Sequence, residues 1–227
     1  MIKILKDNIF NLISKALLFK KKIIINKDIV KNIHIIDFEH HDTFFGYYDL
    51  CPFDIKNKYH LVHRLNKKNN PQNLIEIGLY SIEEKQYKPI TRSNLYNFQF
   101  GSRLSWYDKD CNYIIYNDSF NNNMLTRIID KNTSKIIDEI NFPFFDYNNS
   151  SNEIASTDFI KLGLFRPGYG YKGNYNNDYF KKYNSVLTYN ITKKTNKEII
   201  SINEADNLNK DYSKLNFDFS YFNHLKF

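Results

Sequence analysis

The chain has little of what several common chemistries need. Only two of its 227 residues are cysteines, and neither Cys51 nor Cys111 belongs to a Cys-x-x-Cys pair or lies at zinc-ligand spacing from a histidine. A Gly-x-x-x-x-Gly-Lys-Ser/Thr phosphate loop and a Gly-x-Ser-x-Gly nucleophile elbow are both absent. We therefore expect two buried free thiols, no cofactor, and neither nucleotide binding nor esterase chemistry.

The sequence also lacks a run of about 20 apolar residues, so no membrane span is expected. Its first 22 residues place apolar side chains at helical spacing and end in Lys20, Lys21 and Lys22. Polar residues interrupt this stretch and no small-residue cleavage site follows, which argues against a secretion signal and for a cytoplasmic protein. The pattern predicts a helical arm over residues 1–40, which either packs on the body or on a partner, or lies on the anionic surface of the inner membrane.

A basic module for nucleic acid is missing as well. The formal net charge is +7 and the pI is about 9.1, but the lysines are scattered along the whole length. No zinc finger, helix-turn-helix or aromatic RNA-binding signature is found, so we expect no nucleic-acid partner. What the chain does contain is apolar material. With 42% hydrophobic and 17% aromatic residues, it can build the core of one folded domain.

After residue 40 the sequence changes to short runs of aromatic and β-branched residues bounded by polar clusters, which predict strands. The clearest are Tyr59–Arg64, Asn112–Asn117 and Ser185–Tyr189. Three longer segments share the order strand, polar turn, strand: Leu79–Thr91, Thr126–Ile137 and Leu187–Ile200. Aligned at Ser81, Asp130 and Asn190, these hairpins are 49 and 60 residues apart, close to the repeat of a β-propeller blade. Inner strands are predicted within Asp49–Arg64, Leu104–Asn117 and Ile154–Leu164, and few helices are expected.

Five short motifs carry a family resemblance. They are Thr-Phe-Phe-Gly-Tyr-Tyr-Asp-x-x-Pro-Phe from Thr43, Gln-x-Gly-x-x-Leu-x-Trp from Gln99, Tyr-Asn-Asp from Tyr116, Arg-Pro-Gly-Tyr-Gly-Tyr from Arg166, and Phe-Asn-His-Leu from Phe222. In this order they resemble a largely uncharacterised family of bacterial propeller proteins, similar to the TolB, WD40-like and oligogalacturonate-lyase propellers, which often accompanies glycosyltransferases in surface-polysaccharide gene clusters. The resemblance covers about residues 40–227. It implies an all-β fold, a partial β-propeller of about three to four blades behind the N-terminal helix, and a role in surface-polysaccharide biosynthesis.

The predicted ring is incomplete. Only 187 residues remain after residue 40, enough for about four blades, whereas the proteins that the chain resembles continue past the Asn-His-Leu motif. Phe222–Phe227 resembles the beginning of a further inner strand. We therefore expect an open ring over residues 41–227, which is either completed by a second copy or a partner chain, or left open in a shortened protein.

Loops that enter the inner strands of a propeller converge near its axis, so polar and aromatic side chains of these loops are the candidate ligand-binding residues. They are His41, Asp42, Tyr47, Tyr48 and Asp49 from the first blade, Gln99, Arg103 and Trp106 from the second, Asp158, Arg166, Tyr169 and Tyr171 from the third, and Asn223 and His224 from the fourth. Aromatic planes beside Arg, Asp and Asn suit a sugar, above all an acidic one. The same Tyr, Gly and Asp residues are equally suited to packing between blades, to tight turns and to loop caps.

The histidines raise metal-assisted lyase chemistry as an alternative, because the oligogalacturonate lyases hold a metal with His and Gln. Adjacent residues of a strand point to opposite faces, so His40 and His41 cannot both reach one ion, and we expect no bound metal. Three hypotheses remain open. We favour a sugar-binding propeller without established catalysis, over a polysaccharide lyase or hydrolase and over a protein-interaction scaffold.

Overall fold

The computed structural model describes residues 40–66, 74–166, 168–173, 175–176, 185–208 and 220–227. The chain divides into two units, residues 1–36 and 37–227, and every described residue belongs to the second. The helical arm predicted over residues 1–40 therefore lies outside the described residues except for His40. No helix among the described residues has both the length and the apolar character that crossing a membrane requires.

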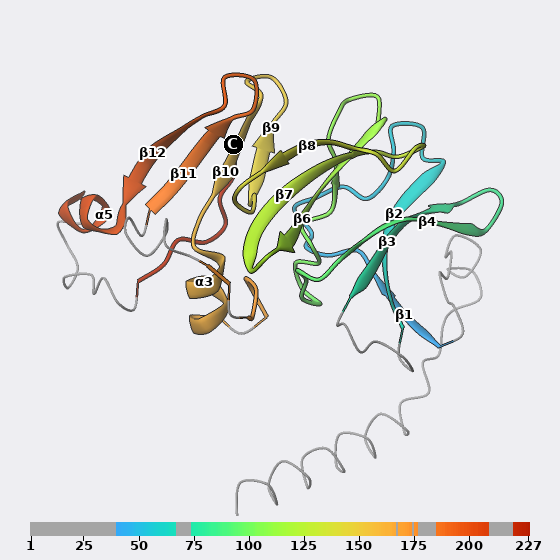
Figure 1. Cartoon of the computed structure of the whole chain (residues 1–227), viewed down its shortest axis with the longest axis horizontal. Helices are drawn as coiled ribbons and strands as arrows, with labels where there is room; N and C mark the ends of the chain where they lie inside the picture. Colours follow the sequence, from blue (N-terminus) through green and yellow to red (C-terminus); the bar gives the residue numbers. More distant parts are fainter. Residues whose placement is uncertain (1–39, 67–73, 167, 174, 177–184, 209–219) are drawn as a thin grey trace, which may run out of the picture. The chain divides into compact units, whose positions relative to one another are not determined.

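Within the described residues, twelve strands form three sheets of four, and in each sheet the strands lie side by side in sequence order and pair antiparallel (Figure 1). The first sheet contains β1 (His41–Phe44), β2 (Tyr59–Asn66), β3 (Ile75–Ser81) and β4 (Gln86–Ser93). The second contains β5 (Ser105–Trp106), β6 (Tyr113–Phe120), β7 (Asn123–Asp130) and β8 (Ile136–Ile140). The third contains β9 (Asp146–Asn148), β10 (Glu153–Ser156), β11 (Ser185–Asn190) and β12 (Thr195–Ser201). A four-stranded antiparallel meander is the blade of a propeller, so the predicted all-β fold of three to four blades is confirmed, with three blades described.

The predicted repeat corresponds to one position in all three sheets. Ser81, Asp130 and Asn190 are the last residues of β3, β7 and β11, the third strands of their sheets. In each case a side-chain oxygen accepts a hydrogen bond from the backbone N–H three residues further on, at 3.2, 2.8 and 2.8 Å respectively. The shared pattern arises because Ser, Asp and Asn side chains stabilise a tight turn by bonding to nearby backbone.

The second sheet packs against both of the others through alternate residues of its strands. Ile114 and Tyr116 of β6 belong to a buried cluster with Leu61 and Ile77 of the first sheet. The residue between them, Ile115, belongs to a second cluster with residues of the third sheet. Successive side chains of a strand point to opposite faces, so one strand can serve two interfaces between blades.

Two of the three predicted inner-strand segments need correction. Leu104–Asn117 does contain the first strand of its sheet, β5, together with most of β6, whereas Asp49–Arg64 supplies the second strand, β2, and the first strand, β1, stands before that segment. In the third sheet β10 ends at Ser156, and the rest of the predicted strand forms helix α3 (Phe159–Phe165). Asp158 caps this helix by accepting hydrogen bonds from the N–H groups of Ile160 and Lys161. A second helix, α5 (Ile202–Leu208), follows β12, and the described residues 220–227 contain no strand.

Candidate functional site

Two loop segments line a pocket of about 680 Å³, which we call the loop pocket. One segment runs from β4 towards β5, and the other follows helix α3. The lining residues are Asn94, Leu95, Tyr96, Asn97, Phe98, Gln99, Gly168, Tyr169, Gly170, Tyr171, Lys172 and Tyr175. Among the described residues of this lining Lys172 carries the single charge, so the pocket combines aromatic rings and amides with a cation.

The side chain of Asn97 holds the two segments of the loop pocket together. Its Oδ1 accepts hydrogen bonds from the backbone N–H groups of Gln99 (2.9 Å) and Phe100 (2.6 Å). Its Nδ2 donates to the carbonyl oxygen of Gly170 at 2.5 Å. Gly170 has a φ of +67°, and a Cβ atom there would collide with the carbonyl oxygen of Phe159. Only glycine therefore fits where the second segment approaches helix α3.

A cluster of five predicted residues adjoins the loop pocket through Tyr169, which belongs to both. This tyrosine cluster contains Tyr47, Tyr48, Arg166, Tyr169 and His224. The hydroxyl of Tyr47 lies 3.3 Å from the hydroxyl of Tyr169 and 3.0 Å from Nε2 of His224. The ring centroids of Tyr47 and Tyr48 are 4.2 Å apart, and the guanidinium carbon of Arg166 lies 5.0 Å from the centroid of Tyr169. Residues from three separate motifs of the sequence thus meet at one place.

The tyrosine cluster presents both a fixed hydroxyl and an accessible ring. The hydrogen bond with Tyr169 is the largest of the effects that raise the pKa of Tyr47 well above its ordinary value, so Tyr47 is neutral near pH 7. Tyr48 is 81% exposed, and Arg166 is exposed as well. A ligand can therefore reach an aromatic face and a cation here while the buried Tyr47 supports them.

Other predicted site residues are held by contacts within the fold. Arg103 is fully buried and donates two hydrogen bonds to the carboxylate of Asp49, at 3.0 and 2.9 Å. The indole N–H of Trp106 donates to the carbonyl oxygen of Pro52 at 3.0 Å. Tyr171 accepts a hydrogen bond from the Nδ2 group of Asn117 at 2.9 Å, and Asp158 caps α3 as described above. Each of these side chains has a structural task.

The remaining predicted residues lie in different places. His41 and Asp42 pair with Asn66 and Leu65 of β2, and neither belongs to the described lining of the loop pocket. Gln99 lines the loop pocket. Asn223 accepts a hydrogen bond from the N–H of His224 at 2.8 Å, and His224 itself has a φ of +56°. Asn223 therefore helps to position His224 rather than facing the loop pocket.

Nine of the twelve residues that line the loop pocket were not predicted as site residues from the sequence: Asn94, Leu95, Tyr96, Asn97, Phe98, Gly168, Gly170, Lys172 and Tyr175. The sequence contains a pattern that could have indicated most of these residues. Tyr96 and Phe98 alternate with amide residues immediately before Gln99, and the glycine-rich motif after Arg166 continues through Lys172 to Tyr175. Glycines 168, 170 and 173 have Gly-x-Gly-x-x-Gly spacing, but they follow helix α3, whereas dinucleotide-binding proteins have this motif between a strand and a helix.

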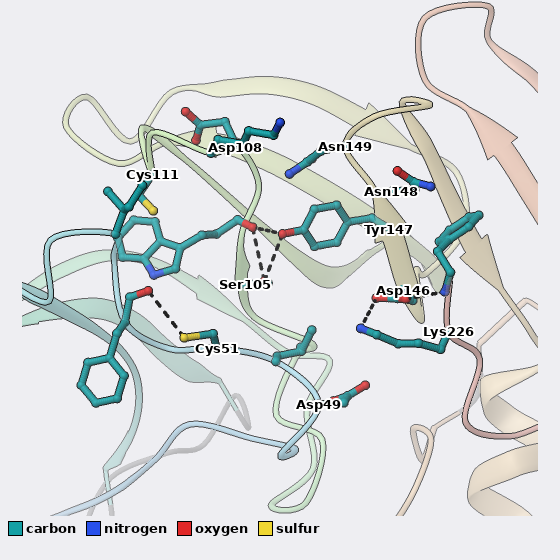
Figure 2. Close-up of a pocket in the computed structure, with 16 residues that line it drawn as sticks. Asp49, Cys51, Ser105, Asp108, Cys111, Asp146, Tyr147, Asn148, Asn149 and Lys226 are labelled. Atoms are coloured by element: carbon teal, nitrogen blue, oxygen red, sulfur yellow. Dashed lines mark hydrogen bonds and ion pairs between the residues drawn. The ribbon is translucent and has the colours of Figure 1, made fainter.

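A second pocket, of about 670 Å³, lies along β5 and β9 (Figure 2). We call it the Asp146 pocket. Its lining includes the predicted residues Asp49 and Trp106, and its full lining is Asp49, Leu50, Cys51, Phe53, Ile55, Ser105, Trp106, Asp108, Lys109, Cys111, Asp146, Tyr147, Asn148, Asn149, Lys226 and Phe227. Asp146 forms an ion pair with Lys226 at 3.2 Å. Burial raises the pKa of Tyr147 and of the Cys111 thiol, so both are neutral near pH 7. Cys111 is buried as predicted, whereas Cys51 is exposed, and both are free thiols.

Within the described parts of the chain, no group of three or more His, Cys, Asp or Glu side chains could hold a metal ion. One of the histidines, His63, is instead buried in β2, with its Nε2 2.8 Å from the hydroxyl oxygen of Ser102.

No protein-family model and no curated protein matches the chain. Solved structures to which it is similar include an uncharacterized protein from Listeria monocytogenes EGD-e (12% identity, TM-score 0.41) and TolB from Acinetobacter baumannii (15% identity, TM-score 0.40). Each match covers 66% of this chain, and 39% and 31% of those chains respectively. A third similar structure is the β-propeller domain of the Trilobed protease from Pyrococcus furiosus, at 17% identity and a TM-score of 0.33. This match covers 45% of this chain and 32% of that one. The chain thus spans between about a third and two fifths of the length of these proteins.

Proposed function

We propose that the protein is a carbohydrate-binding propeller protein of bacterial surface-polysaccharide biosynthesis, working in the cytoplasm. Its ligand is an acidic glycan, bound across the loop pocket and the tyrosine cluster. One observation carries the proposal: accessible aromatic rings, amides and cations from separate motifs meet at one place, and the described lining of the loop pocket contains no carboxylate.

The chemistry of these groups fits a sugar acid. Aromatic side chains such as Tyr48 and Phe98, 81% and 62% exposed, present faces on which the C–H surface of a sugar ring stacks. The guanidinium of Arg166 suits a carboxylate, because charged donors form stronger hydrogen bonds with an ionised acceptor. Lys172 supplies a second cation. It lines the loop pocket and follows Tyr169 in the sequence, whereas Arg166 precedes Tyr169. The volume of about 680 Å³ falls in the range of small-ligand sites.

The test compares an acidic and a neutral oligosaccharide of equal length. A short oligogalacturonate should raise the midpoint of thermal unfolding saturably, and a malto-oligosaccharide should do so less, because a ligand that binds only the folded state stabilises it. Arg166→Ala should weaken oligogalacturonate binding by about 1.5–3 kcal/mol in calorimetry, the contribution of a charged hydrogen bond.

The matched control is Arg92→Ala, which removes an exposed arginine from β4, outside both pockets. This variant should bind as the unaltered protein does. Equal affinity for the two sugars, or equal losses in the Arg92 and Arg166 variants, would mean that overall positive charge attracts the glycan. Absence of any stabilisation by either sugar would favour the alternative of a protein-interaction scaffold.

A further inference from the structure

The Asp146 pocket differs in charge from the loop pocket. Three carboxylates, from Asp49, Asp108 and Asp146, line it together with the lysines Lys109 and Lys226, whereas the described lining of the loop pocket has no carboxylate. The first of them already pairs with the buried Arg103. The protein as a whole has a net charge of +7, so a pocket lined by carboxylates runs against its general character. This second pocket therefore suits a ligand of the opposite charge to an acidic glycan.

Asp146 is the most deeply placed of these carboxylates. Its side chain is only 3% exposed, and its two oxygens accept hydrogen bonds from Nζ of Lys226 at 3.2 Å and from the backbone N–H of Phe227 at 2.9 Å. Figure 2 shows the ammonium group of Lys226 directed at this carboxylate. A carboxylate that is buried to this degree needs such partners, because removing a charge from water is costly unless it is paired.

The two members of this ion pair differ in how firmly they are held. Asp146 is fixed in β9, whereas the side chain of Lys226 is 59% exposed and belongs to a segment without strand or helix among the described residues 220–227. The ammonium group of Lys226 is largely hydrated, so it can separate from Asp146 without becoming a buried unpaired charge, whereas the carboxylate cannot leave the pocket. The carboxylate is thus a permanent feature of the pocket, and the amine is the exchangeable one.

We propose that the Asp146 pocket binds a primary alkylammonium group, and that Lys226 occupies this site when no ligand is present. Asp146 pairs with the ammonium group, in the place that Nζ of Lys226 takes in the structure. The hydrocarbon part lies against the apolar side chains of the lining, among them Leu50, Phe53 and Ile55. Asp108 adds a second carboxylate, which favours a short diamine over a monoamine.

The probe is cadaverine, which carries a primary ammonium group on an alkyl chain as lysine does, and pentane-1,5-diol is its uncharged counterpart. Calorimetry of the whole chain should show binding of cadaverine and none of the diol. Lys226→Ala should bind cadaverine roughly 5- to 10-fold more tightly, because the site is then no longer occupied by the chain's own amine. Lys193→Ala, which removes an exposed lysine from the turn before β12, should leave the affinity unchanged.

Asp146→Asn in the Lys226→Ala background should abolish the binding, with circular dichroism showing that the variant is folded. The proposal is overturned if Lys226→Ala and Lys193→Ala change cadaverine affinity equally, since that would reflect net charge alone. It is also overturned if cadaverine and the diol bind alike, or if cadaverine binds neither the unaltered protein nor the Lys226→Ala variant. None of these outcomes depends on glycan binding at the loop pocket.

Discussion

His63 illustrates how a single buried side chain can connect two sheets. It lies in β2 and is fully buried, and its ring stacks on Phe44 with centroids 5.0 Å apart. Its Nε2 accepts a hydrogen bond from the backbone N–H of Ser102, at 3.2 Å, in the segment before β5. Protonation of Nε2 would place two donors face to face. Burial lowers the pKa of His63 from 6.5 to about 4, so the ring is neutral in the folded protein.

We predict that this histidine makes the protein less stable in mild acid. In the unfolded chain the pKa of His63 returns to its ordinary value, so below about pH 6.5 the unfolded state binds a proton that the folded state excludes until about pH 4. The stabilisation is complete above pH 6.5 and decreases as the pH falls. Between pH 7 and pH 5 the free energy of unfolding should fall by about 2 kcal/mol from this residue.

Urea unfolding of the unaltered protein and of His63→Gln at both pH values measures this contribution, because the other titrating groups cancel in the difference. The glutamine variant should lose less stability on acidification. An equal loss in both proteins would show that His63 is already protonated, or is accessible to water, in the folded state.

The candidate residues show what the sequence can predict at this scale and what it cannot. Arg103 and Arg166 both stand in glycine-containing motifs, and both were predicted to bind ligand. In the structure Arg103 is fully buried against Asp49, whereas Arg166 is exposed beside Tyr169. The difference arises from the packing of one sheet on another, and short motifs carry no information about that packing. The meeting of Tyr47, Tyr169 and His224 could be expected only once the propeller was assumed.

At the scale of elements, the outer hairpins were the most predictable part of the chain. Their turns are formed by neighbouring residues, and the residue that stabilises each turn stands at the end of the third strand of its sheet. The repeat can therefore be recognised in the sequence. Helix α3 was predicted as a strand because Phe159–Phe165 is rich in apolar residues, and a short apolar run does not distinguish helix from strand. Asp158 before it was the available signal, since aspartate is a favoured N-cap.

We predict that Asn190→Ala weakens the turn of the third sheet. Its Oδ1 accepts a hydrogen bond from the N–H of Lys193, and its Nδ2 donates to the carbonyl oxygen of Ser151 at 3.2 Å. Loss of these bonds should lower the free energy of unfolding by about 1 kcal/mol in urea titrations. Asn190→Asp keeps the acceptor oxygen and copies the residue at the equivalent position of the second sheet, Asp130. It should cost less than the alanine variant, and equal costs would mean that the turn does not depend on this oxygen.

At the scale of the whole described unit, the three sheets are joined by side chains as well as by apolar packing. The number of blades was predictable from the spacing of the hairpins, but the contacts between blades were not, because they pair residues far apart in the sequence. Arg103 is the main example. It stands just before the second sheet, pairs with Asp49 after β1, and also donates to the carbonyl oxygen of Phe145, the residue before β9.

We predict that Arg103→Leu destabilises all three sheets together. The change removes one partner of a buried ion pair and leaves the carboxylate of Asp49, whose side chain is 17% exposed, without its guanidinium. Such a loss should cost about 3 kcal/mol in urea unfolding, followed by the fluorescence of Trp106, the one tryptophan in the sequence. Asp49→Asn combined with Arg103→Leu should cost less than the two single changes added together, because the charge left unpaired is then gone.

Hydrogen exchange should speed up in β2, β6 and β10 alike, since Arg103 contacts segments beside all three sheets. Faster exchange in β6 alone would mean that the guanidinium stabilises only its own sheet, and that apolar packing is what holds the blades to one another.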